Sequence, residues 1–471
     1  MSLNRREFLH VMSMAAAAGM LPTTAKAMSG TPGSDLSDEM YNLPMKGNVR
    51  LLHMTDSHAQ LKPVYFREPN VNLGIGPAFG RLPHVVGEKL LDKVGVKPGT
   101  PEAYAFTYLN FQEAAEQYGK VGGFAHMKTA IDRLRDAAGG RQNTVLMDGG
   151  DLWHGSATAL WTRGKCMVDA SNILGVDVMV GHWEFTYKQD EVLTNVARFD
   201  GEFLGQNVRI KDMSLFSDDY YNLVDKHNGL GMYNEDELRP FKPYSIKEMN
   251  GERVAIVGQA FPRTANANPQ ENFPDWSFGL RVKDLKKTVE NIQKTEDVAA
   301  IVMLSHNGMD VDIKMAGQVP GIDAIFGGHT HDGMPQTVDV KRPDGGVCHV
   351  TNAGSNAKFI GVMDLDIQNG KLQGVHYNLL PIFSNALPAD PQMQKYIDDL
   401  YSRVYDDSIV ESRNPEFAVN KDRLGKTYKA ILAEDLGQAD EVLYRRGNFM
   451  GTWDQIIVNA LREEYDTQIA L

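Results

Sequence analysis

Seven acidic and imidazole side chains follow apolar segments of this chain, each close to the point where such a segment ends. They are Asp56, His58, Asp151, His182, His306, His329 and His331. All seven offer nitrogen or oxygen donors of the kind that bind divalent metal ions. Seven such ligands are too many for one ion, whereas two ions that share one carboxylate would have four protein ligands each. Paired ions of this kind lie roughly 3.5–4 Å apart and lower the pKa of bound water, so that it becomes a nucleophile near neutral pH.

The stretch "MDGGDLWHGS" favours Asp151 as the shared carboxylate, because two glycines let the backbone turn tightly and approach the metals. His154, three residues further on, is open to two interpretations. It could orient a ligand from behind, or it could be an ordinary surface histidine at the start of a helix.

The elements that must position these side chains are apolar runs bounded by turns. We expect strands at 49–55, 143–148, 176–181, 299–304 and 322–328, with helices at 122–140 and 279–297 between them. Alternating strands and helices predict an α/β core. Ligands collect at the carboxyl ends of strands in such folds, and each of the five strands is followed there by an aspartate or a histidine.

Composition narrows the range of functions. The chain has 471 residues, enough for two or three domains, with 42% hydrophobic and 23% charged residues. A formal net charge of −13 argues against a broad nucleic-acid surface. A small anionic substrate would have to be held by local positive charge from metals or arginines.

Residues 1–27 have the pattern of an export signal. Arg5 and Arg6 precede a short apolar run, and Ala25-Lys26-Ala27 offers a small-residue cleavage site, so the twin-arginine (Tat) route to the periplasm is expected. Residues 28–46 would then be a linker. No later segment has the length and apolarity of a membrane span, and we expect a monomer that does not bind membranes.

Two cysteines, Cys166 and Cys348, are too few for a thiolate metal site. Export permits a disulfide, but the wide spacing does not show whether they meet. Two small buried residues is the favoured interpretation.

The segments "TDSHAQL", "GGDLWHGS", "GHWEF", "SHNGMDVD" and "GGHTHD" resemble the motifs of the calcineurin-like metallophosphoesterases, in the 5′-nucleotidase branch. The resemblance implies a four-layer α/β/β/α sandwich over 47–388, with an insertion at 61–119. It also implies a linker helix at 389–408 and the start of a C-terminal α/β domain at 409–471, which we expect to be truncated. One metal would bind Asp56, His58, Asp151 and His331; the other would bind Asp151, His182, His306 and His329.

One motif departs from the nucleotidase pattern. Nucleotidases have Gly-Asn-His-Glu, where the asparagine is a ligand and the histidine assists the leaving group; this chain has His182-Trp183 instead. An indole cannot shuttle a proton, so hydrolysis of a poor alkoxide leaving group would suffer. Trp183 could exclude bulky nucleosides or simply pack in the core.

That change, together with "GQAFPRTANANP", resembles the SoxB family, the thiosulfohydrolases of bacterial sulfur oxidation. The resemblance implies two manganese ions and release of sulfate from a thiosulfate adduct on a cysteine of the SoxYZ carrier protein. Arg263 in this stretch could bind the sulfonate, or it could be an exposed loop arginine. The alternatives are a periplasmic 5′-nucleotidase or sugar-nucleotide hydrolase, and a non-enzymatic protein that binds the carrier.

Overall fold

The computed structural model describes residues 36–65, 74–404, 434–440 and 451–470, with single residues at 425, 430 and 443. The predicted export signal at 1–27 lies outside them, as do parts of the predicted linker, insertion and C-terminal segment. Contacts divide the chain into two compact units. The larger comprises Asp38–Pro63 and Gly122–Ala433, and the smaller comprises Met1–Ser37, Val64–Val121 and Glu434–Leu471.

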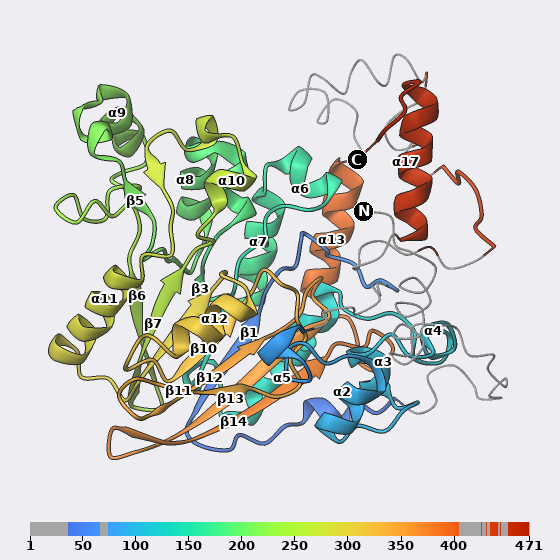
Figure 1. Cartoon of the computed structure of the whole chain (residues 1–471), viewed down its shortest axis with the longest axis horizontal. Helices are drawn as coiled ribbons and strands as arrows, with labels where there is room; N and C mark the ends of the chain where they lie inside the picture. The colour runs from blue at the N-terminus through green and yellow to red at the C-terminus, as the bar shows by residue number, and fades with distance from the viewer. Residues whose placement is uncertain are drawn as a thin grey trace. The chain divides into compact units, whose positions relative to one another are not determined.

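Two six-stranded sheets form the centre of the larger unit (Figure 1). The first has the order β14 (Lys371–Pro381), β13 (Phe359–Gln368), β1 (Val49–Met54), β2 (Thr144–Asp148), β3 (Val178–Met179) and β4 (Glu202–Phe203). The second has the order β11 (Val338–Lys341), β12 (Val347–Asn352), β10 (Ala324–Gly327), β9 (Ala300–Ser305), β7 (Glu252–Gln259) and β6 (Tyr244–Met249). A two-stranded ladder joins β5 (Arg209–Ile210) to β8 (Trp276–Ser277).

Both sheets are mixed. In the first, β1 pairs in parallel with β2 and antiparallel with β13, so that Leu52 stands opposite Leu146 on one side and Val362 on the other. In the second, β7, β9, β10 and β12 run parallel, and β6 and β11 are antiparallel at the two edges. The parallel strands point their carboxyl ends toward the same edge of their sheet, which is where the predicted ligands follow.

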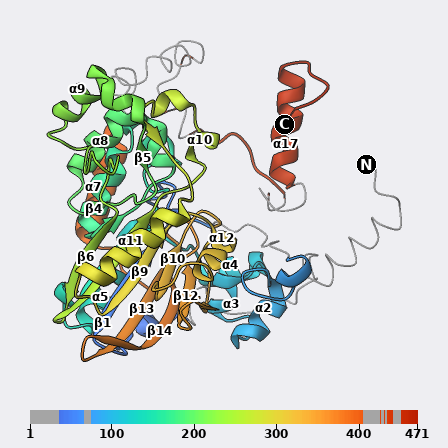
Figure 2. The ribbon, with the colours of Figure 1, turned by 60° about the vertical axis from the view of Figure 1, so that its left-hand side comes forward.

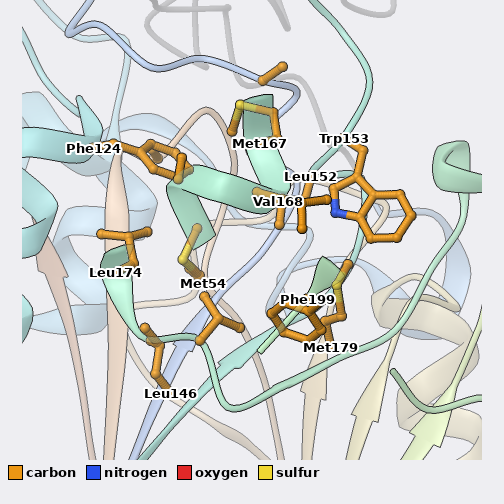
Figure 3. Close-up of a cluster of buried hydrophobic side chains, with 14 of the residues drawn as sticks. Met54, Phe124, Leu146, Leu152, Trp153, Met167, Val168, Leu174, Met179 and Phe199 are labelled. Carbon is orange, nitrogen blue, oxygen red and sulfur yellow. The ribbon is translucent and has the colours of Figure 1, made fainter. Parts of the chain in front are cut away.

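Two apolar cores hold the layers together. One lies between the sheets, where Leu51 and Val145 of the first sheet and Val302 of the second are fully or almost fully buried. The other packs the first sheet against helices α5 (Phe124–Ala137), α6 (Ala157–Thr162), α7 (Lys165–Leu174), α8 (Lys188–Arg198) and α13 (Pro391–Val404). Figure 3 shows this second core, with Met54 and Leu146 from the sheet near Phe124 and Val168 from the helices.

Helices α11 (Val282–Thr295) and α12 (Met309–Ala316) lie against the second sheet, as both views show (Figure 2). Helix, sheet, sheet and helix form the four-layer α/β/β/α sandwich that the motifs imply. The larger unit also holds α9 (Asp218–Lys226) and the short α10 (Thr264–Ala267). The smaller unit contains α2 (Gly87–Val94), α3 (Pro101–Phe106), α4 (Phe111–Tyr118) and α17 (Thr452–Glu464). No helix among the described residues combines the length and apolarity needed to cross a membrane.

The predicted strands and helices are found, with one correction of length. The run at 176–181 forms only the two-residue strand β3, because both neighbouring strands end opposite Met179, β2 at Asp148 and β4 at Phe203. The structure confirms two buried cysteines that do not pair: Cys166 lies in α7, Cys348 lies in β12, and both thiols are free.

A buried ion pair joins β1 to the neighbouring strand β13, where Asp364 lies directly opposite Arg50. The Arg50 guanidinium donates to both carboxylate oxygens of Asp364 at 2.7 and 2.9 Å, and to the carbonyl oxygens of Leu43 and Leu134 at 3.0 Å. The two charged side chains are 0% and 2% exposed. Removing one partner from such a pair leaves a buried charge without compensation.

We therefore expect Asp364→Ala to lower the free energy of unfolding by about 3–5 kcal/mol in urea denaturation. Asp399→Ala removes an exposed carboxylate that pairs with Lys395 on α13 and should cost at most about 1 kcal/mol. Equal losses for the two variants would show that the Arg50 charge is compensated in another way.

Candidate metal centre

The structure brings all seven predicted ligand side chains together at the carboxyl ends of five strands. Asp56 and His58 follow β1, Asp151 follows β2, His182 follows β3, His306 follows β9, and His329 and His331 follow β10. They fall into two groups, in each of which the potential ligand atoms lie within 4.8 Å of one another. The first group is Asp151, His182, His306 and His329; the second is Asp56, His58 and His331.

Asp151 lies between the two groups. Its carboxylate is 3.1 Å from Nδ1 of His182 and 3.2 Å from Nε2 of His306, both in its own group. It is also 3.8 Å from Nε2 of His58 in the other group. A carboxylate in this position is suited to bridge two cations, which is the role that the sequence predicts for Asp151.

Backbone geometry turns these side chains toward a common centre. Five of the seven residues have left-handed φ angles: Asp56 49°, His58 45°, Asp151 56°, His329 75° and His331 59°. Such conformations cost of order 1–3 kcal/mol each and persist only where the surroundings enforce them. Five of the seventeen non-glycine residues with positive φ in the described part of the chain are thus members of the ligand cluster.

Glycines make the close approach possible. A Cβ atom on Gly328 would lie 2.5 Å from the Thr55 hydroxyl and 3.0 Å from the Asp56 carboxylate. One on Gly149 would lie 2.4 Å from the same hydroxyl. The Thr55 hydroxyl occupies this space and donates to Asp56 at 2.6 Å.

Glu184 organises the two loops that carry Asp151 and His182. Its buried carboxylate accepts backbone N–H groups from Leu152 at 2.7 Å and from His182 at 2.7 Å. It also accepts from Asp151 at 3.3 Å and from Trp153 at 3.2 Å. Sequence reasoning did not single out Glu184; the signal was a glutamate inside the "GHWEF" motif, next to the ligand.

The donor set fits divalent ions. Burial opposes ionisation of Asp56, but the charges of His306 and His331 outweigh it and lower the pKa of that carboxyl to about 2. Burial and the charges of His306 and His182 lower the pKa of His329 to about 4, so the ring stays a neutral imidazole, the form that binds metals. His306 differs from His329 in its protonation. Burial lowers its pKa, but the charges of Asp151 and Asp56 outweigh burial and raise the pKa to about 10.

The surroundings of the imidazole nitrogens also indicate that the cluster binds divalent ions. Nδ1 of His306 donates to the carbonyl oxygen of Gly149 at 2.6 Å, which orients the ring. Nε2 of His182 is buried and has no hydrogen-bond partner among the described residues, and the buried Nε2 of His306 faces the carboxylates of Asp151 and Asp56 at 3.2 and 3.7 Å. His58 and His331 point their Nε2 atoms at each other, 2.9 Å apart. Buried nitrogens without partners are costly, and a metal ion would satisfy them. The two clusters thus fit a dimetal site, whereas the assignment of each ligand to one ion stays a prediction.

Aromatic rings border the cluster. The Phe261 ring lies 4.1 Å from the rings of both His182 and His329. The half-buried Trp183 indole lies 4.8 Å from His182 and stacks on the His154 imidazole at 5.7 Å, with 22° between the planes. His154 therefore lies beside Trp183, where burial lowers its pKa, and is no isolated surface residue.

Arg263 is exposed and lies two residues beyond Phe261, at the start of α10. No carboxylate among the described residues is within ion-pair distance of it. The structure does not bring Arg263 into the cluster of seven, and its predicted role in binding an oxyanion stays untested.

The chain is similar in sequence to known nucleotidases and in structure to a sulfate thiohydrolase. No family model matches the chain. Protein UshA of Yersinia enterocolitica is 27% identical over 292 residues, which cover 55% of this chain and 48% of UshA. The 5′-nucleotidase of Bos taurus is 25% identical and covers 59% of this chain and 47% of that protein.

Among solved structures, the sulfate thiohydrolase SoxB of Thermus thermophilus, in complex with glycerol, is similar over 90% of this chain and 69% of that one. The TM-score is 0.74 and the sequence identity is 29%. The chain spans about half the length of the curated relatives it matches.

Metal content tests the arrangement. We expect close to two ions per chain in the protein, measured by elemental analysis after dialysis, and loss of both in Asp151→Ala. Glu184→Gln replaces one accepting oxygen with an amide that cannot accept N–H groups, so metal affinity should fall about 10–100-fold. Glu191→Gln, on the neighbouring helix α8, is the control. One ion per chain in the unaltered protein, or full metal retention in Glu184→Gln, would contradict this account.

Proposed function

We propose that this chain, which belongs to the metallophosphoesterase family that contains the 5′-nucleotidases and SoxB, is a dimetal hydrolase that releases sulfate from a thiosulfate adduct on a carrier-protein cysteine. The proposal includes a carrier of the SoxYZ type, two manganese ions, export to the periplasm by the Tat route and a monomeric state.

The observation that carries the proposal is the pair His182-Trp183. His182 lies in the ligand cluster, 3.1 Å from Asp151, in the place where nucleotidases have an asparagine. The next residue is the indole of Trp183, where nucleotidases have the histidine that assists the leaving group. The metal ligands are thus kept while that proton donor is lost.

The predicted reaction needs less acid assistance than phosphate-ester hydrolysis. Water attacks the terminal sulfur of the adduct, and the bond between that sulfur and its sulfur neighbour breaks. The electron pair leaves on the carrier, which becomes a persulfide, and the water oxygen leaves in sulfate. A persulfide is much less basic than an alkoxide, so a strong general acid is less necessary.

The residues around the cluster have distinct tasks in this proposal. Two bound divalent ions would supply Lewis acidity, which lowers the pKa of water and offsets the charge that develops on the sulfonate oxygens. Asp151 and Glu184 hold the two ligand loops in register. Arg263 is free to pair with the sulfonate or with the carrier. The Trp183 indole, stacked on His154, leaves less room for a nucleoside beside the cluster.

The alternative is a 5′-nucleotidase or sugar-nucleotide hydrolase. Its support is that the curated relatives are nucleotidases, at 25–27% identity. The structural similarity to SoxB covers more of the chain, 90% against 55–59%, and at a higher identity of 29%. We therefore favour the thiosulfohydrolase.

The decisive measurement compares two substrates. Metal-loaded protein should release sulfate from a carrier whose cysteine carries thiosulfate, and it should hydrolyse AMP feebly. The double change His182→Asn with Trp183→His restores the nucleotidase ligand and acid, so hydrolysis of AMP should rise. Acid assistance is typically worth about 10²–10⁴-fold, which makes even partial recovery measurable.

The comparison requires matched metal occupancy, because asparagine binds metal less tightly than imidazole does. The single change Trp183→Phe removes the indole without adding an acid and is the control. Brisk AMP hydrolysis by the unaltered protein, without sulfate release from the loaded carrier, would overturn the proposal in favour of the nucleotidase.

A further inference from the structure

A cleft of about 560 Å³ opens on the larger unit, and none of its lining residues belongs to the metal centre. One wall is a stripe of α11: Asp284, Lys287, Thr288 and Asn291. These positions are spaced i, i+3, i+4 and i+7, so they share one face of the helix. The buried residues Leu285, Val289 and Ile292 face the core instead. A polar face of this helix is therefore directed at a cavity.

Two arginines lie on the floor of the cleft. Arg209 is 9% exposed and Arg239 is 6% exposed, and both guanidinium groups donate to the carbonyl oxygen of Gln206. Two cations that share one acceptor lie close enough to repel each other. Consistent with this, burial and then the charge of Arg239 lower the pKa of Arg209 to about 10.

The carboxylates that pair with these two arginines are more exposed than the arginines themselves. Arg209 pairs with Asp284 at 3.1 Å, and Arg239 pairs with Glu237, whose side chain is 57% exposed. Lys287 adds a third positive charge to the lining, and no acceptor for its ammonium group is found among the described residues. The cleft is thus locally cationic in a chain whose formal net charge is −13.

Neutral donors surround these charges. Asn234 uses its side-chain oxygen to accept the backbone N–H of Glu237 at 2.9 Å, which leaves its amide group free to donate. The hydroxyl of Thr288 lies 3.5 Å from Arg239 and is also part of the lining. Tyr233, 52% exposed, offers a ring at the rim on which a flat group could stack.

We propose that this cleft between α11 and the segment from Tyr233 to Tyr244 is a second ligand site, which binds a small molecule bearing a tetrahedral oxyanion such as phosphate or sulfate. An oxyanion would offset the repulsion between Arg209 and Arg239 and would accept from Lys287 and Thr288. Arginine forks match the oxygen geometry of phosphate and sulfate. The volume admits a nucleoside monophosphate as well as the free ion. Comparing the affinities of a free ion and an organic phosphate distinguishes these two ligands.

The test avoids the buried arginines, because their loss could unfold the protein. Lys287→Glu reverses an exposed charge in the cleft, and Lys286→Glu makes the same change at a half-buried position of α11 that faces away from the lining stripe. The full-length, metal-loaded protein and both variants are titrated calorimetrically with inorganic sulfate and with a non-hydrolysable phosphonate analogue of AMP. Ligand held at the metal centre contributes equally to all three proteins.

We expect Lys287→Glu to weaken one class of site by about tenfold or more, because the reversed charge lies beside the bound anion, and Lys286→Glu to change it less than about twofold. Equal affinity for the two ligands would identify a free oxyanion as the ligand. A phosphonate that binds more than about tenfold tighter would identify an organic phosphate that also uses the Tyr233 ring. Equal effects of the two variants would overturn the proposal. So would the absence of binding outside the metal centre at a ligand concentration of about 10 mM.

Discussion

The carboxylate of Glu184 is the constraint on which the metal centre depends. It accepts backbone N–H groups from both loops that follow β2 and β3, so the positions of Asp151 and His182 are fixed by one buried side chain. Hydrogen bonds to a charged acceptor are stronger than those between neutral groups. They offset part of the cost of the left-handed backbone at Asp151. Without that anchor, the bridging position of Asp151 between the two ligand groups would not be maintained.

Electrostatics inside the cluster follow from crowding. Two buried carboxylates, Asp56 and Asp151, face five imidazoles in a volume from which water is largely excluded, so each protonation state depends on its neighbours. The carboxyls are held ionised, whereas His58 and His329 are held neutral by burial. These are the protonation states in which both residue types bind divalent ions. Apart from His306, whose pKa the two carboxylates raise to about 10, these groups are therefore prepared for cations.

Hydrogen bonds connect the metal centre to the cationic cleft. Gln206, whose carbonyl oxygen accepts from Arg209 and Arg239, donates its side-chain amide to Gln259 at 2.5 Å. The carbonyl oxygen of Gln259 accepts the backbone N–H of His306 at 2.9 Å. The last residue of β7, Gln259, is thus hydrogen-bonded both to a ligand of the cluster and to the residue that accepts from the two arginines.

The amino-acid sequence by itself determined which residues end the strands and which donors they present. Apolar runs at 49–55 and 299–304 became β1 and β9, and the segments at 122–140 and 279–297 became α5 and α11, because burial periodicity is a local property. The motifs predicted all seven residues of the cluster and the four-layer sandwich. Ligand roles, domain boundaries, carrier and cellular location stay predictions.

Tertiary structure decided what depends on residues distant in sequence. β13 lies beside β1 although some 300 residues separate them, and this pairing rests on hydrogen bonds and packing that no local pattern encodes. The run at 176–181 shortened to β3 because its partner strands β2 and β4 both end opposite Met179, and beyond that point His182 lies beside Asp151. The sequence shows that residue 184 is a glutamate. It does not show that four backbone N–H groups from two loops donate to this carboxylate, which is what makes Glu184 an anchor. The type of each side chain is known from the sequence, whereas the groups that it contacts, and therefore its role, depend on the fold.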